Sequence, residues 1–570
     1  MKHNLSLLFL LLSFALAAKP VNPEDAEKIA AAILKQGGSR SVSVHRIAED
    51  KAITKSPSTD AAFYYFAGDR GGFAIVPSDD ALPSVIGWAP DGEFRLDGIP
   101  ANVKAWMDMW RKIYDAMMAG ELKEDRGPVY GAGSKLLETA NWNQDSPYNS
   151  FCPTIGGKTC YTGCVATATA IVMRYHEWPD CAGGTLPSYT FTGSDGQQHY
   201  IGSVTLGHAY DWANMPLDMN GASAAQEQAV AQLIYEAGVM VKSNYGTDGT
   251  GAYTSDVYPG LVEYYDYDAS AFEYYRCYYS DEVWKGMLRS NIDDAGPVLY
   301  SGYGEESGHA FVLDGYNAQG QFHINWGWGG YNNGYYVIPA FDEYVDGHAA
   351  VLNIRRNAGG SIAEGLVIDG DPEKVKGLSS TAETFRKGEP FGISCQYIFN
   401  ISERPFNGRL AFAVLHADDS LGAVLDSVDV SIPRLGGVRY ELDDCMIEET
   451  IRIGDRIRVF FKSENTPAWT SIPANLEDGF IGEIAIADSR SIAEVTSFRY
   501  TSSTGILLVS TKEDAQWSLT DSSGQPCTKG VGFDGGALTI DTRQYPLGSY
   551  MLTLSKEEDS KTLEFVFGVK

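Results

Sequence analysis

The chain is poor in basic residues, and after its first twenty positions it has no apolar run long enough to cross a membrane. Lys and Arg number 44 against 74 Asp and Glu, so the formal net charge is −30 at pH 7. Such a charge argues against nucleic acid or an anionic membrane as partner, and solubility explains it simply. Because a spanning helix needs about 20 apolar residues in a row, we expect no membrane span.

Cysteine is also scarce, since the chain has eight, and their spacings fit no zinc-binding pattern. We therefore expect no metal and no other cofactor. The N-terminal sequence MKHNLSLLFLLLSFALAAKP contains an early Lys, an apolar run and the A-x-A site Ala15-Leu16-Ala17, which predict a signal peptide over residues 1–17. An exported chain can form disulfides, and Cys395 and Cys445 are candidates to join two strands of one β domain.

The 570 residues are too many for one core and predict several domains. Residues 18–136 indicate an α+β unit that ends in a linker, and residues 137–357 an α+β unit whose helices precede a sheet. Residues 358–493 alternate short apolar runs with Gly and Pro turns, which is typical of a β-sandwich. Residues 494–570 continue this style in a smaller β domain.

Apolar residues at helical spacing predict five helices, and alternating runs predict a hairpin over about 63–77 and a later sheet. The helices are expected at about 18–35, 101–119, 164–178, 222–241 and 280–291, and the later strands near 298–300, 309–316, 320–326, 334–338 and 349–354. Between the first two units, residues 120–136 are charged and rich in Gly, which predicts a linker. Its basic residues Lys123, Arg126 and Lys135 are candidate sites of proteolytic cleavage.

One cysteine stands where a helix is expected to begin. Cys164 follows Gly163 at the end of a loop rich in Gly, Pro and Thr, and the apolar run after it ends at Trp178-Pro179. Cys164 then lies in the first turn, where unpaired N–H groups and the helix dipole favour a thiolate nucleophile. A buried or disulfide-bonded cysteine is the alternative, because paired cysteines are the rule in exported proteins.

A nucleophilic cysteine needs a base, and three of the nine histidines occur as Gly-His-Ala: His208, His309 and His348. Only His309 leads into a buried strand that is followed by a second strand carrying Asn325 and Trp326. We expect this hairpin to bring Asn325 beside His309, so that the amide orients the imidazole and Trp326 shields their bond from water. The other two histidines are expected to be structural.

Other polar residues near this pair have less specific signals. An oxyanion hole needs a second N–H donor beside that of Cys164, and Gln144 lies just upstream, although an ordinary loop glutamine is the alternative. His176 is expected to bind the last carbonyls of its helix. His323 shares a strand face with Asn325 and is expected to lie further from the cysteine.

The motifs of the second unit occur in a specific combination. They are Trp142-Asn143-Gln144, Gly163-Cys164-Val165-Ala166-Thr167-Ala168, Gly308-His309-Ala310-Phe311 and Asn325-Trp326-Gly327-Trp328. Together they resemble the streptopain family of cysteine peptidases over about residues 137–355. The resemblance implies a papain-like fold, endopeptidase activity on protein or peptide substrates, Cys164 as nucleophile and His309 as base. It also implies that Asn325 or Trp326 takes the third catalytic position, with Asn325 ranked first.

Two flanking regions extend this resemblance. Residues 64–107, with Gly72-Phe73-Ala74-Ile75-Val76-Pro77, resemble the inhibitory propeptide of the same family. This implies a zymogen whose prodomain acts as an intramolecular inhibitor and disturbs His309 until the linker is cut. Residues 494–570, with Leu547-Gly548-Ser549-Tyr550, are similar to sorting domains of the type IX secretion system. The resemblance thus implies secretion machinery as a partner and a location outside the cell or on its surface.

Two other functional classes stay open. A Cys-His amidase or transglutaminase would use the same two side chains on other substrates, whereas an adhesin or binding protein would rely on its β domains. Only a peptidase creates new peptide termini in a protein substrate, so casein and small amides would separate the enzymes. The presence of every Cys, His, Asn and Gln candidate favours an active peptidase.

Overall fold

The computed structural model describes most of the chain outside its first 18 residues. The described residues are 19–36, 43–49, 61–96, 99–122, 133–193, 195–303, 308–340, 347–369, 377–382, 385, 387–452, 454–476, 480–486, 496–501, 506–511, 515–533, 537–546, 548–556 and 559–567. The predicted signal peptide and the candidate cleavage sites Lys123 and Arg126 lie outside them. Within the described part, no helix combines the length and apolar character needed to span a bilayer.

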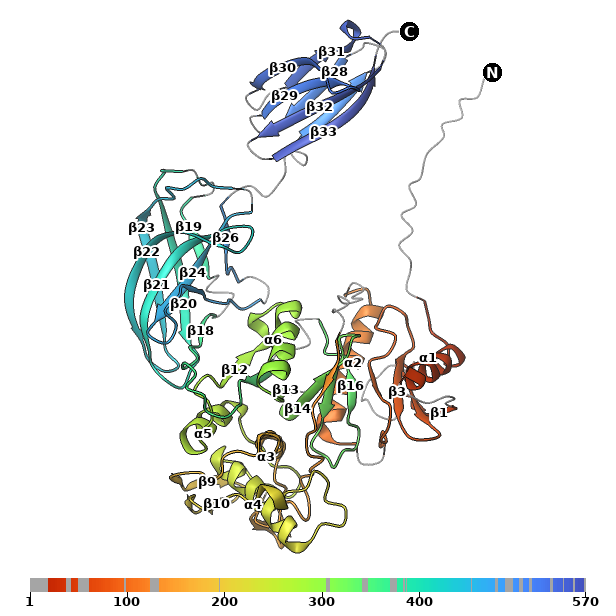
Figure 1. The fold of residues 1–570 in the computed structure, drawn as a ribbon, viewed down its shortest axis with the longest axis vertical. Coiled ribbons are helices and arrows are strands. Elements are labelled where there is room, and N and C mark those ends of the chain that lie inside the picture. The colour runs from red at the N-terminus through yellow and green to blue at the C-terminus, as the bar shows by residue number, and fades with distance from the viewer. Residues whose placement is uncertain are drawn as a thin grey trace.

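A mixed α/β body is followed by two β domains (Figure 1). The body consists of an N-terminal unit, residues 19–122, and a central unit, residues 133–357. One sheet runs through both units in the order β1-β2-β3-β4-β16-β15-β14-β13-β17-β12, and β5 pairs with β14. The two units are joined where Trp88 of β4 lies opposite Tyr335 of β16 in an antiparallel pair.

The strands of this sheet come from both units. The N-terminal unit supplies β1 (Val44–Glu49), β2 (Phe63–Gly68), β3 (Phe73–Pro77) and β4 (Gly87–Ala89). The central unit supplies β5 (Lys135–Leu136), β12 (Phe272–Tyr275), β13 (Val298–Tyr303), β14 (Gly308–Tyr316), β15 (Phe322–Asn325), β16 (Gly334–Tyr336) and β17 (Ala349–Leu352). The predicted hairpin is confirmed, because β2 and β3 pair antiparallel.

Helices cover both faces of the sheet. The N-terminal unit has α1 (Pro23–Gln36) and α2 (Ala101–Met118), and the central unit has α3 (Cys164–His176), α4 (Ala224–Met240), α5 (Val257–Tyr264) and α6 (Asp281–Asp294). Side chains alternate along β14, so Ala310 and Val312 pack in the core that contains α3, whereas Phe311 and Leu313 pack in the core that contains α2 and α6.

Local sequence signals explain where several helices begin. Asn22 caps α1, because its Oδ1 accepts the N–H of Asp25 at 2.9 Å, and Pro23 occupies the first helical position. Ser223 and Gln226 form a capping box at the start of α4. The five predicted helices are confirmed, but α5 was not predicted, since its sequence contains Pro259-Gly260, which is usually a turn signal.

Short hairpins and single turns complete the central unit. These are β6 (Thr154–Ile155), β7 (Lys158–Thr159), β8 (Thr185–Leu186), β9 (Tyr189–Thr192), β10 (Gln198–Ile201), β11 (Val204–Thr205), and the 3₁₀ turns η2 (Trp212–Asn214), η3 (Thr254–Asp256) and η4 (Arg276–Tyr278). Ile155, Leu186, Phe191, Ile201 and Trp212 of these elements join the buried core that contains α3 and α4.

The third region is a β-sandwich. One sheet holds β18 (Leu366–Ile368), β19 (Leu378–Ser380), β20 (Phe391–Asn400) and β23 (Gly437–Cys445). The other holds β21 (Phe406–Leu415), β22 (Leu421–Ile432), β24 (Arg456–Ser463), β25 (Thr470–Ser471) and β26 (Ile484–Ala485). Both sheets contribute apolar side chains to one core.

The disulfide expected in this sandwich is absent. The β20–β23 register pairs Cys395 with Tyr440 and Cys445 with Phe391, so the cysteines are offset along the strands. An offset of several residues at about 3.4 Å each exceeds the Cα separation of about 7 Å that a disulfide tolerates. All eight cysteines are free thiols, and the expectation was wrong because cross-strand register cannot be read from the sequence alone.

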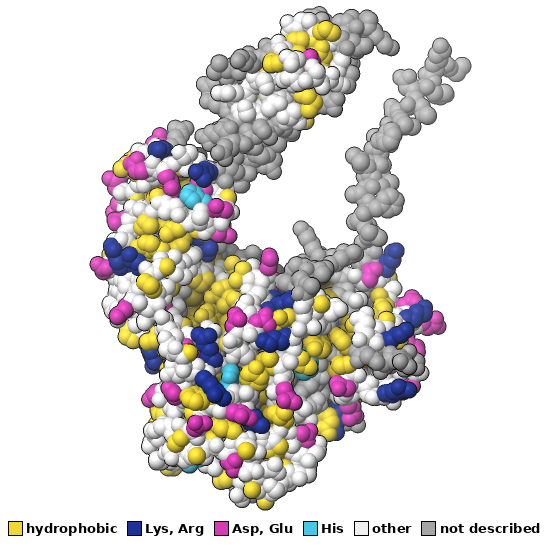
Figure 2. Space-filling view, viewed as in Figure 1, with side chains coloured by type: hydrophobic (Ala, Val, Ile, Leu, Met, Phe, Trp, Pro, Cys, Tyr) yellow, Lys and Arg dark blue, Asp and Glu magenta, His cyan; other side chains and the backbone are white. Residues whose placement is uncertain are grey.

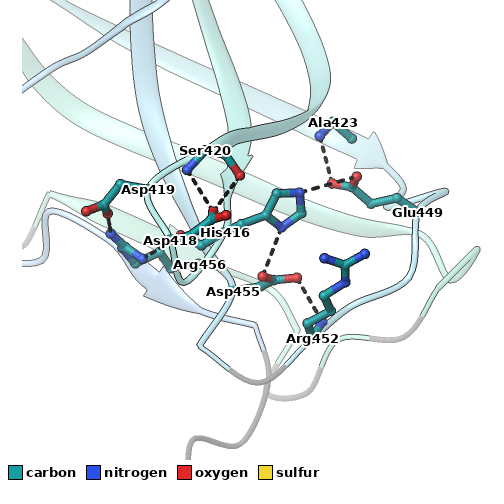
Figure 3. A network of polar contacts seen from close by, with 9 residues as sticks. All are labelled: His416, Asp418, Asp419, Ser420, Ala423, Glu449, Arg452, Asp455 and Arg456. Atoms are coloured by element: carbon teal, nitrogen blue, oxygen red, sulfur yellow. Dashed lines mark hydrogen bonds and ion pairs between the residues drawn. The ribbon is translucent and has the colours of Figure 1, made fainter. Parts of the chain in front are cut away.

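A polar network fixes one end of the sandwich (Figure 3). His416 lies between two carboxylates, with Nδ1 3.0 Å from Asp455 Oδ1 and Nε2 3.8 Å from Glu449 Oε2. Asp455 also accepts the N–H of Arg452, and Glu449 accepts that of Ala423. Since the carboxylates belong to loops and His416 follows β21, the network ties the β21–β22 turn to the segments before β24.

The C-terminal domain is a smaller pair of sheets. One contains β27 (Thr496–Thr501), β28 (Ile506–Thr511) and β31 (Ala537–Asp541), and the other β29 (Ala515–Asp521), β30 (Pro526–Phe533), β32 (Gly548–Lys556) and β33 (Asp559–Phe567). Its core is built from Leu507, Val509, Leu519, Ile540, Tyr550, Leu552 and Leu554. A role as an export address stays a prediction.

Candidate active site

Cys164 lies at the first position of α3, as predicted. Gly163 precedes it with φ +90°, and a Cβ at that position would lie 2.9 Å from the carbonyl oxygen of Thr250. Only glycine fits there, because other residues rarely adopt this φ and the neighbouring backbone leaves no space. The N–H of Ala310 on β14 donates to Cys164 Sγ at 3.4 Å. The start of α3 and the start of β14 are therefore in direct contact.

The protonation of the pair differs from the expectation of a thiolate. Burial raises the pKa of the Cys164 thiol, although the N–H groups of Ala310, Val165 and Cys164 itself act in the opposite direction. Burial also lowers the pKa of His309 to about 4. Near pH 7 both groups are therefore neutral, a thiol and an unprotonated imidazole, because burial outweighs the effect of the helix N-terminus.

His309 lies next to the residue that touches the sulfur, but on the other face of the strand. It pairs with Gly302 of β13, and side-chain alternation places it with Phe311. Trp106 of α2 packs against Phe311 with ring centroids 5.9 Å apart. His309 is thus on the side of the sheet that the N-terminal unit covers, whereas Ala310 is on the side of Cys164.

Asn325 is not opposite His309, contrary to the expectation from the hairpin. In the β14–β15 register Asn325 pairs with Val312, three residues further along the strand. Its Nδ2 donates to Thr139 Oγ1 and to the carbonyl of Ala140, both at 3.0 Å, and its Oδ1 accepts the N–H of Gly327 at 3.1 Å. The β14–β15 register shifts at an irregularity between Leu313 and Gly315, and the local sequence does not reveal this irregularity.

Trp326 is fully buried beside the same strand end. Its Nε1 donates to the carbonyl of Asn332 at 3.0 Å, and Trp106 packs edge-on to it with centroids 5.9 Å apart. The roles expected for Asn325 and Trp326 in catalysis stay predictions.

A short chain of polar groups behind Asn325 was missed from the sequence. Thr139 donates from Oγ1 to Asp314 Oδ2 at 2.5 Å, and Asp314 Oδ1 lies 2.5 Å from His323 Nδ1. Asn325 joins it through Thr139. The only available signal was an Asp, Asp314, inside an otherwise apolar strand, and its contact with His323 shows that this imidazole binds β14 and not the cysteine.

Gln144 has the properties of an oxyanion-hole donor. It is 4% exposed, and its Nε2 has no hydrogen-bond partner among the described residues. Its backbone is held on both sides, since its N–H donates to Asn143 Oδ1 and its carbonyl accepts the N–H of Thr162 at 3.0 Å. Thr162 lies two residues before Cys164. A buried N–H without a partner is costly, and an arriving negative oxygen would satisfy it.

The other histidines have structural surroundings. The expectation for His176 was wrong, because its side chain hydrogen-bonds the backbone of Ile354, while Arg356 donates to the carbonyl of His176. His348 Nδ1 lies 2.9 Å from Tyr300 Oη, and burial lowers its pKa to about 3. His208 contacts Gln232 at 3.1 Å and Glu236 at 3.5 Å.

The N-terminal unit holds the segment around Trp326 through hydrogen bonds. Asn102 of α2 donates from Nδ2 to the carbonyl of Trp326 at 2.9 Å and accepts the indole N–H of Trp328 at 3.1 Å. Asn102 is 3% exposed, so these bonds are shielded from water. The N–H of Arg95 donates to Asn332 Oδ1 at 2.7 Å. The N-terminal unit therefore restrains the Trp326–Asn332 segment.

Lys135 is not an exposed cleavage candidate, contrary to the expectation. It belongs to β5 and lies opposite Tyr316 of β14. Its Nζ donates to the carbonyls of Ile292 at 2.8 Å and Asp293 at 3.0 Å, which caps the end of α6. The long-range pairing that protects this residue cannot be seen in a Gly-rich sequence.

Comparison with known proteins gives consistent matches. The profile of the peptidase C10 family matches residues 142–336, and that of the Spi protease inhibitor matches residues 18–113. Thiol protease/hemagglutinin PrtT of Porphyromonas gingivalis is 32% identical over 356 residues, which is 59% of this chain and 40% of that protein. Streptopain of Streptococcus pyogenes is 30% identical over 317 residues, which is 51% of this chain and 78% of that protein. The chain thus covers most of streptopain but less than half of PrtT.

Two solved structures are also similar. A fragment of Prevotella intermedia prointerpain A shares 29% identity, covers 55% of this chain and 99% of that one, and superposes with a TM-score of 0.47. The active interpain A cysteine protease of the same organism shares 34% identity, covers 39% and 94%, and superposes with a TM-score of 0.35.

Proposed function

This chain belongs to the peptidase C10 family and is a cysteine-type peptidase, and from this premise we propose that it is a papain-like endopeptidase made as a latent zymogen. Cys164 is the nucleophile and His309 the base. The observation that carries the proposal is the 3.4 Å contact between the Ala310 N–H and Cys164 Sγ. Ala310 directly follows His309, so this contact brings the backbone of the proposed base next to the proposed nucleophile. The signal peptide and the C-terminal domain belong to export in this proposal.

Latency follows from the contacts of the N-terminal unit, which acts as the prodomain. Its strand β4 extends the sheet of the central unit, and Asn102 holds the segment that carries Trp326 and Trp328. Alternation along β14 places His309 on the face of Phe311, which packs against α2, and both His309 and Cys164 are neutral near pH 7. The imidazole of His309 has therefore not taken the proton of the Cys164 thiol, and the thiolate nucleophile is unformed.

Activation requires cleavage of the linker and departure of α2. The start of β14 can then reorient so that His309 faces Sγ and accepts its proton, giving a thiolate and an imidazolium. A polar partner for the imidazole would come from Asn325 after a shift at the end of β15, with Trp326 covering the pair. These steps use only groups that already lie at the start of α3 and at the ends of β14 and β15.

The chemistry is acyl transfer to sulfur followed by hydrolysis. The thiolate of Cys164 attacks the peptide carbonyl, and the resulting oxyanion accepts hydrogen bonds from the N–H of Cys164 and from Nε2 of Gln144. His309 then gives its proton to the leaving amine, which departs as the new N-terminus of the second fragment. Water, deprotonated by His309, attacks the thioester and releases the first fragment with a free carboxylate.

The test uses the full-length chain and its Cys164→Ala variant. Wild type should process its own linker, cleave casein into fragments with new N-termini, and be labelled by an epoxide thiol inhibitor once the prodomain has been removed. The variant should do none of these, whereas Cys181→Ala, which removes an exposed thiol elsewhere, should behave as wild type. Casein cleavage by purified Cys164→Ala would refute the proposal, and hydrolysis of small amides without casein cleavage would favour an amidase.

A further inference from the structure

The inference concerns the side of the cleft that binds substrate before the scissile bond, and it rests on the proposed function. The leaving amine must lie near His309, which donates its proton, and therefore toward Trp326 and Trp328. This side is covered by α2 of the prodomain. The part of the substrate that precedes the scissile bond then extends in the opposite direction, past the residues on the other side of Cys164.

On that other side, a loop of the central unit packs directly against the nucleophile. Thr250 leaves no space for a Cβ at Gly163, and its Oγ1 donates to the carbonyl of Tyr161 at 2.7 Å. Thr254 Oγ1 lies 3.2 Å from Ser301 Oγ, and Ser301 pairs with Ala310, whose N–H contacts the sulfur. The loop around residues 246–254 therefore forms the wall next to Cys164 on the acyl side.

The β-sandwich continues directly from this wall. The N–H of Glu403, on the loop between β20 and β21, donates to Tyr258 Oη of α5 at 3.3 Å. Burial raises the pKa of Asp256, just before α5, and the charges of Glu403 and Arg434 also act on it, so both lie close. A pocket lies between the two and is lined by Tyr258 and Pro259 of α5 and by Glu403 of the sandwich loop, so both elements contribute to one continuous surface.

A second contact region fixes the sandwich on the body. Leu476 donates its N–H to the carbonyl of Cys277 at 2.8 Å, and Tyr278 donates its hydroxyl to Asp369. In Figure 1 the sandwich accordingly adjoins β12 and α5. On the face drawn in Figure 2, basic and hydrophobic side chains both occur where the sandwich meets the body. These contacts hold the sandwich against the body that contains Cys164.

Two large apolar side chains are exposed on the segments that lead from Cys164 to the sandwich. Tyr253, in the wall, is 71% exposed, and Leu435, on the sandwich turn after β22, is 60% exposed. Leu435 also has φ +52°, an unfavourable backbone conformation for a residue with a side chain, and it packs into no core. Backbone outliers of this kind are enriched at ligand contacts, which makes the exposed Leu435 a candidate contact for a bound chain.

We propose that the sandwich is part of the substrate-binding surface of the mature enzyme. An unfolded polypeptide runs from Cys164 past Tyr253 to Leu435, and an apolar side chain several residues before the scissile bond packs on Leu435. The backbone of such a substrate is extended, at about 3.3 Å per residue, so only long substrates reach the sandwich. The enzyme thus prefers unfolded protein chains over short peptides.

The experiment compares two quenched fluorogenic substrates with the activated full-length enzyme. Both have the same residues next to the scissile bond, but one has two residues before it and the other has twelve, with Leu or Val in the distal part. Leu435→Ser should raise KM for the long substrate about fivefold and leave its kcat unchanged. Both constants for the short substrate should stay at the wild-type values. A fivefold rise in KM is typical of the loss of one exposed apolar contact.

Leu421→Ser is the matched control. Leu421 is 42% exposed and begins β22, whereas Leu435 follows the end of that strand, so the two leucines lie at opposite ends of the sandwich. The control should match wild type on both substrates. Equal KM values of Leu435→Ser and wild type for the long substrate, or an equal rise for both substrates, would overturn the proposal. If the wild-type enzyme cleaved neither substrate, the proposed function would fail and this inference with it.

Discussion

The amide nitrogen of Ala310 lies 3.4 Å from the sulfur of Cys164, and this contact joins two segments that are 146 residues apart in the chain. It requires the start of α3, fixed by Gly163, to meet the start of β14 in the middle of the sheet. His309 is one residue away, yet alternation along β14 directs it to the face of α2. In the proposed mechanism Cys164 is thus positioned before His309 turns toward it, which is the state expected of an intact zymogen.

The reactivity of the Cys164 thiol should change with processing. In the intact chain burial raises its pKa, so at pH 7 it is protonated and should react slowly with iodoacetamide, with a rate that increases only in strongly alkaline solution. After prodomain removal, pairing with His309 should make it react quickly near pH 6. Mass spectrometry of the alkylated peptide measures both rates, and a fast reaction of the intact chain at pH 6 would contradict this account.

Acid should destabilise the central unit through His348. Its pKa is lowered to about 3 by burial and, to a smaller degree, by the charge of Arg276. Between about pH 3 and pH 6.5 the imidazole of His348 is neutral in the folded chain but protonated in the unfolded chain. The burial of neutral His348 therefore costs no stability above about pH 6.5, and the free energy of unfolding decreases as the pH falls from there toward 3. The expected loss is about 2 kcal/mol at pH 5.

Urea unfolding at pH 7.5 and pH 5 measures this effect by intrinsic tryptophan fluorescence. In His348→Gln the difference between the two pH values should be smaller than in wild type by about 2 kcal/mol. His45→Gln serves as control, since the His45 side chain is 62% exposed, and it should leave the difference unchanged. An identical pH dependence of wild type and His348→Gln would show that the buried imidazole is not the cause.

Prodomain binding should depend on Asn102. Its side chain makes two buried hydrogen bonds to the segment with Trp326 and Trp328, and loss of both should cost about 2 kcal/mol. The isolated Asn102→Ala prodomain should therefore inhibit the processed enzyme about 30-fold more weakly than the wild-type prodomain. Lys104→Ala, two residues further along α2, is the control and should retain wild-type inhibition, measured as Ki with a peptide substrate.

The sequence predicted the elements of the site better than their relation to one another. Gly163 and Pro179 mark the ends of the α3 region, and the alternating run after Gly308 marks β14, so both elements could be located locally. Whether Asn325 meets His309 depends on the β14–β15 register, which pairs it with Val312 instead. A shift of this kind reflects an irregularity near Asp314 and the hydrogen bonds of Thr139, neither of which has a local sequence signal.

Other errors have the same physical origin. Lys135 lies in a stretch whose composition favours a linker, but pairing with Tyr316 makes it a strand. Cys395 and Cys445 do lie on neighbouring strands, as expected, yet the register separates them. Burial also could not be read from position alone, because the helix start favours a thiolate at Cys164 while the surrounding core raises its pKa. Each of these outcomes depends on contacts between distant segments.

Gln144 should affect the rate of catalysis without supporting the fold. Its Nε2 has no partner among the described residues, so Gln144→Ala removes no hydrogen bond of this donor and should leave the free energy of unfolding equal to wild type or slightly higher. In the proposed mechanism this N–H binds the oxyanion, so its loss should lower kcat by about 100- to 1,000-fold with little change in KM. An ordinary loop glutamine would show the reverse pattern, a loss of stability with normal kcat.

Gln198→Ala is the matched control, because Gln198 is an exposed glutamine of the same unit whose Nε2 donates to Thr192 Oγ1. It should keep the wild-type kcat. Gln144→Glu sharpens the test, since it preserves the size of the side chain but replaces the donor by a carboxylate that repels the oxyanion. This variant should be at least as slow as Gln144→Ala, and a kcat within threefold of wild type would exclude Gln144 from the oxyanion hole. The backbone N–H of Cys164 would then need a different second donor.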